Sequence, residues 1–162
     1  MAGIESLMNQ IRDAVDNSLQ SSANDLLAKA VALAPVEKTQ ENKLTGKIYR
    51  EGGVLKQSGF VRPNHYSLDK RRFDVVFDTR IIRPNKQNFN YAIIQHEKQM
   101  PHPDGGEWKY LETPYKSSID EYRIEIANAI QPYISQGGKV ILGSEVTVMG
   151  TTSTGMSSKI GE

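Results

Sequence analysis

Cysteine is entirely missing from this chain of 162 residues. Its absence excludes disulfide bonds, thiol nucleophiles and zinc sites built on cysteine, and it fits a reducing compartment. A chain of this length can bury about two-thirds of its unfolded surface, so it needs neither a disulfide nor a metal to fold. We therefore expect one domain, covering residues 1–149, with a flexible tail over residues 150–162 that are rich in Gly, Ser and Thr.

Long apolar runs are missing as well. No stretch approaches the roughly 18 uncharged apolar residues that a membrane span needs. The first fifteen residues lack both the basic and the apolar region of a signal peptide. We therefore expect a protein made in the cytoplasm that has no membrane partner.

The chain has little net charge of either sign, since it holds 20 basic and 19 acidic residues. This near balance argues against a dedicated nucleic-acid binder. Along the chain, however, residues 1–34 hold 2 basic and 4 acidic groups, residues 35–90 hold 12 and 6, and residues 91–138 hold 4 and 7. The basic middle is open to two interpretations: solvated loops, or a face that meets DNA phosphates or an acidic partner ring. The candidate contact residues are Lys43, Lys47, Arg50, Lys56, Arg62, Lys70, Arg71 and Arg72.

The first segment is predicted to be helical. Apolar residues recur at three- and four-residue steps from Ile4 to Leu33, as one buried stripe of a helix requires. Serine and asparagine between residues 17 and 24 compete with helical hydrogen bonds, so one bent helix or two shorter ones are both possible. Pro35 is expected to end the segment.

A polar loop and strands are expected next. Turn signals at Gly46 and at residues 52–53 predict a long loop over residues 36–57. Such a loop is unusually long for a compact domain and tends to be functional or mobile. Strands are expected over residues 58–62, 73–82 and 91–96. In the second of these, Asp74 and Asp78 share one face and apolar side chains occupy the other.

A second helix is expected after the turn at residues 103–106. Thr113 is a suitable N-cap, with Pro114 at the first helical position, and an apolar stripe runs from Tyr115 to Ile134. Gly137 and Gly138 should end it, and residues 139–149 are predicted to form a last strand. The order of elements indicates an α+β fold, with a mainly antiparallel sheet of about four strands packed by the two long helices.

Residues with catalytic potential do not fall into a working pattern. His96 and Glu97 are consecutive, so on a strand they would point to opposite faces, and with His102 they lack the spacing of a helical zinc motif. Asp74 and Asp78 would lie roughly 13 Å apart on a strand. The sequence holds no nucleophile elbow and no phosphate-binding loop. We expect no enzyme, no cofactor and no metal site, and a metal-dependent nuclease is the weakest alternative.

Two stretches nevertheless form motifs. The first runs from Leu33-Ala34-Pro35 to Gly53-Val54-Leu55-Lys56-Gln57-Ser58-Gly59. The second is Tyr91-Ala92-Ile93-Ile94-Gln95-His96-Glu97, followed by Gly105-Gly106-Glu107-Trp108-Lys109-Tyr110-Leu111-Glu112-Thr113-Pro114. Over about 100 residues they resemble the signatures of phage head–tail joining proteins, the tail-completion or minor capsid type of long-tailed double-stranded DNA phages. The residues that match the family motifs in structural positions are Pro35, Leu55, Ser58, Tyr91, Ala92, His96, Glu97, Lys109, Tyr110 and Leu111.

The resemblance implies a structural subunit of the virion neck that has no small-molecule substrate. It implies self-assembly into a ring, a hexamer or a dodecamer, with further contacts to other neck proteins, the portal or adaptor, and the tail tube or terminator. Double-stranded DNA would be present only as the contents of the channel. A tail terminator or tube-like virion protein is the alternative. The loop between Pro35 and Gly53 is longer than in the family pattern, and the terminal strand and tail are not family features.

Overall fold

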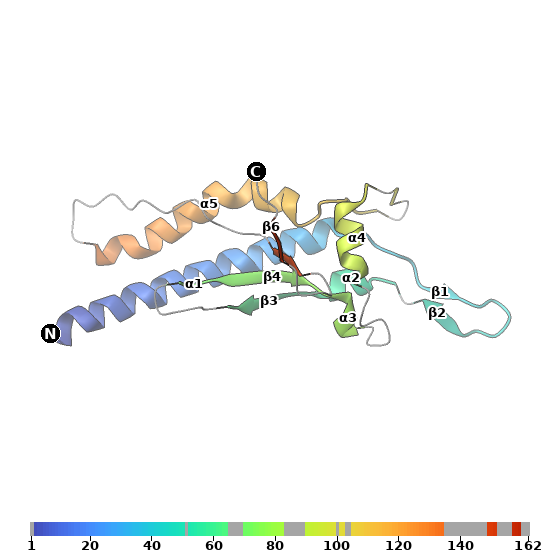
Figure 1. The fold of residues 1–162 in the computed structure, drawn as a ribbon, viewed down its shortest axis with the longest axis horizontal. Helices are drawn as coiled ribbons and strands as arrows, with labels where there is room; N and C mark the ends of the chain where they lie inside the picture. Colours follow the sequence, from blue (N-terminus) through green and yellow to red (C-terminus); the bar gives the residue numbers. More distant parts are fainter. Residues whose placement is uncertain are drawn as a thin grey trace.

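A computed structural model of the protein describes residues 2–50, 52–64, 70–82, 90–99, 101–102, 105–134, 149–151 and 157–159. The molecule is elongated, and helix α1 (Ala2–Leu33) runs along its length (Figure 1). Helix α5 (Glu112–Ile130) packs antiparallel to α1, and a strand pair packs on α1 as well. The prediction of an α+β fold with two long helices and antiparallel strands is confirmed.

Helix α1 is one unbroken helix, which decides between the two possibilities left open by the sequence. The stretch over residues 17–24, which is rich in serine and asparagine, is stabilised by a contact with α5. Ser22 is buried there, and its hydroxyl donates to Glu125 of α5 at 3.2 Å. The helix ends at Leu33, just before Pro35, as predicted. At about 1.5 Å per residue it spans roughly 48 Å, and α5, η2 and the β3–β4 pair contact it.

The contact between α1 and α5 combines small apolar residues with a few polar bonds. Ala23 and Ala30 are buried and let the two helices approach closely. The Tyr122 hydroxyl donates to Asp25 at 2.7 Å, and Lys29 forms an ion pair with Asp25 at 2.6 Å. The Lys29 and Tyr122 hydrogen bonds lower the pKa of Asp25, while burial raises the pKa of Tyr122. Of these two bonds, the one from Tyr122 to Asp25 crosses between the helices and ties α5 to α1 at that point.

Strands β3 (Gly59–Pro63) and β4 (Phe73–Phe77) form an antiparallel pair in which Val61 lies opposite Val75. The first strand was predicted within a residue of its position. The prediction for residues 73–82 is wrong in its second half, because β4 ends at Phe77 and a helical turn, α3 (Thr79–Ile82), follows. Asp78 causes the change: its carboxylate accepts from the Arg80 backbone N–H at 3.0 Å and starts the turn.

The strand predicted over residues 91–96 is wrong: this segment is helix α4 (Tyr91–Glu97). Asn90 caps it by accepting from the Ala92 N–H at 3.2 Å, and this cap outweighs the β-propensity of the two isoleucines that follow. A four-stranded sheet is therefore not confirmed. The described strands pair two by two, as β1 (Gln40–Glu41) with β2 (Ile48–Arg50), β3 with β4, and β5 (Met149–Thr151) with β6 (Ser157–Lys159).

Both predicted ends of the second helix need correction. Helix α5 begins at Glu112 with Leu111 in the N-cap position, and Thr113 lies inside it. It stops at Ile130 because Pro132 cannot continue the pattern, and a 3₁₀ turn, η2 (Gln131–Tyr133), follows. The predicted stop at residues 137–138 and most of the strand over residues 139–149 lie outside the described residues.

The segment predicted as loop 36–57 contains local structure. Strands β1 and β2 form a hairpin that projects from the body at the end where α1 stops (Figure 1), and a helical turn, α2 (Val54–Gln57), follows it. Leu55 of α2 belongs to the hydrophobic core, whose buried residues are Ala30, Ala34, Leu55, Phe77, Ala92 and Tyr110. Among the described residues, none of the helices has the length and apolar character needed to cross a membrane.

Candidate functional site

The two motif stretches, far apart in sequence, meet at the end of α1. The Glu107 N–H donates to the Leu33 carbonyl at 2.8 Å, and the Val36 N–H donates to the Gly105 carbonyl at 3.2 Å. Between these two bonds Gly106 lies so close to Pro35 that a Cβ on it would stand 2.3 Å from the Pro35 Cα. Pro35, predicted as a helix stop and as a structural residue of the first motif, is thus half of a backbone joint.

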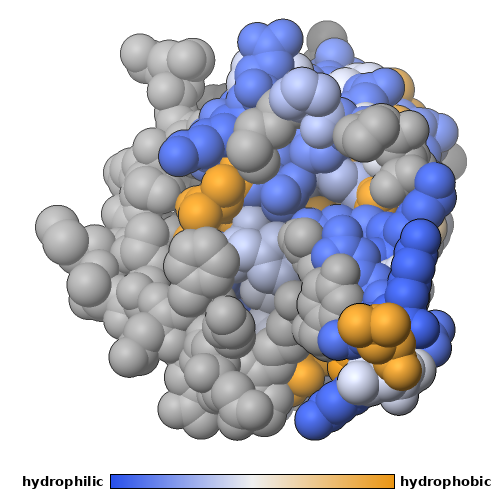
Figure 2. Space-filling view, turned by 90° about the vertical axis from the view of Figure 1, so that its right-hand side faces the viewer, coloured by the Kyte–Doolittle hydropathy of each residue, from blue (hydrophilic) through white to orange (hydrophobic). Residues whose placement is uncertain are grey.

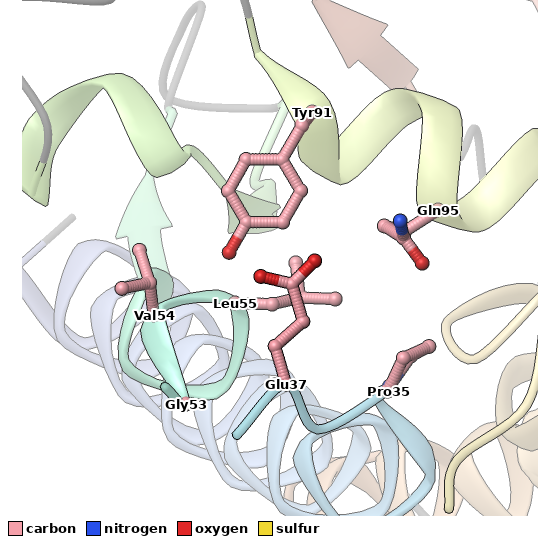
Figure 3. Close-up of a pocket in the computed structure, with 7 residues that line it drawn as sticks. All are labelled: Pro35, Glu37, Gly53, Val54, Leu55, Tyr91 and Gln95. Carbon is pink, nitrogen blue, oxygen red and sulfur yellow. The ribbon is translucent and has the colours of Figure 1, made fainter. Parts of the chain in front are cut away.

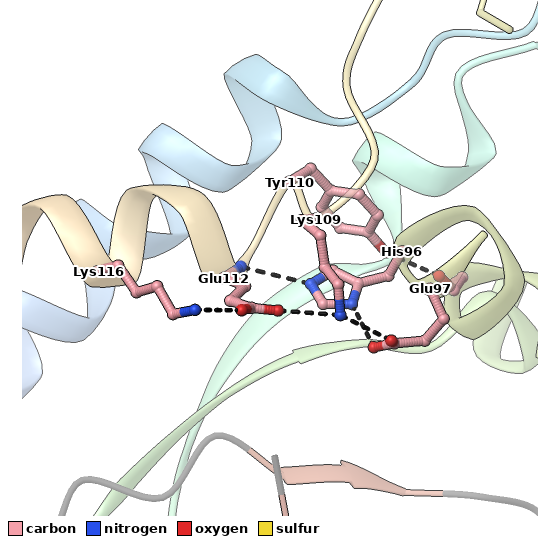
Figure 4. Close-up of polar contacts among 7 residues, drawn as sticks. His96, Glu97, Lys109, Tyr110, Glu112 and Lys116 are labelled. Atoms are coloured by element: carbon pink, nitrogen blue, oxygen red, sulfur yellow. Dashed lines mark hydrogen bonds and ion pairs between the residues drawn. The ribbon is translucent and has the colours of Figure 1, made fainter. Parts of the chain in front are cut away.

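Tyr110 joins α4 to the core beside this joint (Figure 4). Its side chain is 2% exposed, and its hydroxyl donates to the Ala92 carbonyl at 3.1 Å. Its ring packs edge-on against Phe77 and His96, at centroid distances of 5.0 and 5.2 Å. Burial raises the pKa of Tyr110, so the hydroxyl stays a donor. The neighbouring motif residues Tyr91 and Leu111 pack against the same core.

His96 is held from both sides of its ring. The Glu112 backbone N–H donates to His96 Nε2 at 3.3 Å, while Nδ1 lies 2.7 Å from the Glu97 carboxylate. Because Nε2 accepts a hydrogen bond, the proton of the neutral ring belongs on Nδ1, which donates to Glu97. The residue is only 7% exposed. Neither nitrogen is left to bind a metal or to abstract a proton.

The expectation that His96 and Glu97 point to opposite faces is wrong, because they lie on a helix and contact each other. Glu97 also forms an ion pair with Lys109 at 2.7 Å, and Lys109 reaches Glu112 at 2.9 Å (Figure 4). Lys116 contacts the other oxygen of Glu112 at 2.5 Å. These lysines lower the pKa of Glu112 to about 2. Burial alone would raise the pKa of Glu97, but hydrogen bonds from Lys109 and His96 outweigh it and the pKa falls.

Lys109 has a backbone φ of 59°, a left-handed conformation that non-glycine residues adopt rarely. Its N–H donates to the His96 carbonyl at 3.0 Å, and its ammonium bridges Glu97 and Glu112. The strained turn therefore joins the C-terminal end of α4 to the first turn of α5. Hydrogen bonds, ion pairs and ring contacts thus join the described motif residues between Tyr91 and Leu111 into one cluster.

The spacing of residues in the first motif has a structural explanation as well. Leu55 and Ser58 are each 2% exposed, and the Ser58 hydroxyl donates to the Leu55 carbonyl at 2.7 Å. The spacing of three residues between leucine and serine therefore closes helical turn α2. Gly53 starts that turn with a φ of 71°, which favours glycine.

A small pocket lies between the two motif stretches (Figure 3). Its lining residues are Pro35, Glu37, Gly53, Val54, Leu55, Tyr91 and Gln95. The Glu37 side chain lies among them, and the space amounts to about 190 Å³ including the part open to solvent. Pockets that enclose small-molecule ligands are usually about 300–1,000 Å³. This pocket is a gap where packed elements meet, and it is too small to enclose such a ligand.

Three of the predicted basic contact residues form ion pairs within the chain. Arg62 and Arg72 form ion pairs with Asp74 at 3.1 and 2.5 Å, and Arg71 forms one with Asp16 at 3.2 Å. Burial would raise the pKa of Asp74, yet hydrogen bonds from Asn64 and these arginines lower it. These arginines therefore fasten the β3–β4 pair and α1.

The remaining basic residues are found on the hairpin, on α2 and directly before Arg71. Lys43 and Lys47 are exposed on the β1–β2 hairpin, and Arg50 belongs to β2. Lys56 donates to the Ala32 carbonyl at 3.3 Å, and Lys70 is exposed ahead of β4. The basic block of the sequence is thus divided between the projecting hairpin and the strand pair along α1.

The carboxylates considered for a metal site have other partners. Asp78 lies beyond the end of β4, so it does not share a strand face with Asp74 as expected, and it forms an ion pair with Arg80 at 2.8 Å. His102 is half-buried, and its carbonyl accepts from the Gly105 N–H at 2.9 Å. Within the part of the chain that the structure describes, no three His, Cys, Asp or Glu residues group as a metal site would require.

Sequence reasoning missed one structural pair, Thr79 and Asn90. Thr79 is 1% exposed, and its hydroxyl donates to the Asn90 side-chain oxygen at 2.9 Å. The Asn90 amide in turn donates to the Phe77 carbonyl at 3.2 Å. An asparagine placed before an apolar run is a helix N-cap signal, and it would have revealed both α4 and this contact.

Fold and site together define an α+β protein whose motif residues hold its helices together. Comparison of the chain with models of protein families, with curated proteins and with solved structures finds no match in any of the three. The functional assignment therefore depends on the residues of the chain itself.

Proposed function

We propose that this chain is a structural subunit of a phage virion neck, a head–tail connector or tail-completion protein that forms a ring between the portal side of the head and the tail. One observation carries the proposal. The two stretches that resemble this family meet in a backbone joint, where Gly106 packs on Pro35 and Glu107 bonds to Leu33. Motif residues that hold the backbone together in this way are suited to a structural protein, which must keep its contact surfaces in place for neighbouring subunits.

The chemistry of the joint favours assembly over catalysis. His96, the motif residue best suited to acid–base work, has both ring nitrogens engaged. The pocket between the two motif stretches, at about 190 Å³, is too small to enclose a typical ligand. A protein of this kind acts through the surfaces it presents, without substrate, metal or cofactor.

The elongated shape favours a role among neighbours. The β1–β2 hairpin stands clear of the body (Figure 1), and Leu44 near its tip is 96% exposed. Projecting arms of this kind let a subunit reach adjacent subunits, other neck proteins, the portal or adaptor, and the tail tube or terminator. The exposed lysines on the hairpin would meet an acidic neighbour or the DNA that fills the channel.

The location of the protein in assembled particles tests the proposal. Gold labelling of the tagged chain in intact virions should mark the junction of head and tail. Label along the tube or at the tail tip would contradict the neck assignment and favour a terminator or tube-like protein. Cleavage of DNA by the purified protein that stops with a chelator and is lost in His96→Gln would contradict the structural role altogether.

A further inference from the structure

The tip of the β1–β2 hairpin presents an apolar side chain in a fixed position. The Asn42 carboxamide accepts from the Leu44 N–H at 2.9 Å, and the Gly46 N–H donates to the Asn42 carbonyl at 2.8 Å. Gly46 has a φ of 65°, which closes the turn. Leu44 is nonetheless 96% exposed, and Lys43 and Lys47 flank it in the sequence. An ordered turn that exposes leucine loses little conformational entropy on binding.

The base of the hairpin is anchored to the body. The Gly53 N–H donates to the Glu37 carbonyl at 3.2 Å, and the Gly52 N–H donates to the Thr39 hydroxyl at 3.1 Å. Val54, directly after the hairpin, is 2% exposed. The arm therefore extends from a fixed point of the core. Figure 2 looks at this end of the molecule, and among the residues that it colours the hydrophobic ones form small patches between hydrophilic ones.

A surface of opposite charge lies on α5. Tyr122 is buried against α1, so Ile124, two positions later on the helix, faces outward and is 60% exposed. Asp120 and Glu121, four and three positions before Ile124, flank it on that face, and their side chains are 86% and 65% exposed. Each has one intrachain cation, Arg123 at 3.0 Å and Lys29 at 3.8 Å respectively. Ile124 is therefore an exposed apolar residue flanked by two carboxylates on the outer face of α5.

The two surfaces match in chemistry and are separated in space. Residues 38–50 of the hairpin hold four basic groups and one acidic group, whereas Glu112–Ile130 holds four acidic and two basic groups. The hairpin projects from the end where α1 stops, while α5 runs back toward the N-terminal end (Figure 1). One chain therefore cannot bring its own hairpin onto its own Ile124, and a second copy can.

We propose that the hairpin tip of one copy docks on the outer face of α5 of the next copy, with Leu44 on Ile124 and Lys43 and Lys47 against Asp120 and Glu121. The contact joins different surfaces of two identical chains, so it is heterologous and closes into a ring when the rotation between copies permits. This inference rests on the proposed function and names the interface that would build the ring. Ile81 is also 62% exposed, but it follows Arg80 at the hairpin end of the molecule, so it fits the basic tip poorly.

The missing cysteines make the contact directly testable, because each introduced thiol is then the only one in its chain. Full-length Leu44→Cys and Ile124→Cys proteins, one of them carrying a mass tag, are mixed and treated with a short bis-maleimide. The expected product is a tagged–untagged heterodimer, and the double variant should give a ladder of multimers. Ile81→Cys replaces Ile124→Cys in the control mixture. Equal heterodimer yield with this control, or linkage only between two Leu44→Cys chains, overturns the proposal.

Charge exchange gives a second readout that does not require a cross-link. The pair Lys43→Glu and Lys47→Glu should weaken self-association by about tenfold or more, and Asp120→Lys with Glu121→Lys in a mixed partner should restore it. Failure of rescue overturns the contact. If light scattering still shows a defined oligomer of the unaltered protein, the ring survives and only this interface is lost. A chain that is monomeric by light scattering and absent from the particle neck sinks the proposed function too.

Discussion

Gly106 packs directly on the Pro35 backbone, with room for a hydrogen atom and for nothing larger. A Cβ at Gly106 would stand 2.3 Å from the Pro35 Cα and 2.6 Å from its nitrogen, and both of these atoms are backbone. The contact ties the end of α1 to the segment that leads into α5. It therefore controls how the two long helices are joined at the end from which the hairpin projects.

Substitution of Gly106 by alanine should destabilise the protein strongly. Gly105 provides the matched control, since both glycines have positive φ, of 96° and 101°, but a Cβ at Gly105 meets nothing within 4 Å. Gly105→Ala should cost about 1–2 kcal/mol from backbone conformation alone. Gly106→Ala adds a backbone clash and should cost several kcal/mol or prevent folding. Urea unfolding followed by circular dichroism measures the difference, and equal costs would contradict the joint.

Substitution of Asn90 should destabilise the protein, although the residue lies in a connection between two helices. Asn90→Ala removes the cap of α4 and leaves the buried Thr79 hydroxyl and Phe77 carbonyl without this partner. The free energy of unfolding should fall by about 2 kcal/mol or more. Asn90→Ser keeps a neutral cap acceptor and loses the amide donor to Phe77, so its cost should be intermediate. A larger loss for Ser than for Ala would refute this assignment of roles.

Acid should weaken the ion-pair cluster at the start of α5. Hydrogen bonds from Lys116 and Lys109 hold the pKa of Glu112 at about 2, below its ordinary 4.5. Folding thus favours the ionised form, so this stabilisation is complete above about pH 4.5 and is lost as the pH falls toward 2. Glu112→Gln should lower stability at pH 6 and reduce the difference in unfolding free energy between pH 6 and pH 3.

The control for this pH experiment is Glu107→Gln, which changes an exposed carboxylate outside the cluster. It should leave the difference between pH 6 and pH 3 close to that of the unaltered protein. High salt should also shrink the contribution of Lys116, whose side chain is 70% exposed. If Glu112→Gln and Glu107→Gln have the same pH profile, Glu112 does not have the role assigned to it.

Much of the fold was predictable from sequence because periodicity over long segments is a strong signal. Helix α1, its end before Pro35 and the β3 strand follow from apolar spacing and from proline chemistry. The predictions failed where short segments depend on capping. Asn90 and Asp78 each start a helical turn with a side-chain oxygen, and both turns were predicted as strand from the β-branched residues beside them.

The candidate site was predictable in its residues but not in its geometry. The motifs named Pro35, His96, Lys109 and Tyr110, yet spacing alone could not show that Gly106 seats on Pro35 or that His96 accepts from Glu112. Those contacts join segments far apart in the chain. Summed charge was a weaker guide, because Arg62 and Arg72 both form ion pairs with Asp74 within the fold. The Arg62 side chain is still 51% exposed, so its contact with a partner stays a prediction.

Electron microscopy of the purified protein is the sharpest test of the neck assignment. We expect closed rings of uniform diameter, formed by the protein alone or on addition of portal and tail complexes. Lys43→Glu combined with Lys47→Glu should reduce their number while the circular dichroism spectrum stays unchanged. A folded protein that remains monomeric under all these conditions, and that does not join portal–tail complexes, would contradict the assignment as a neck subunit.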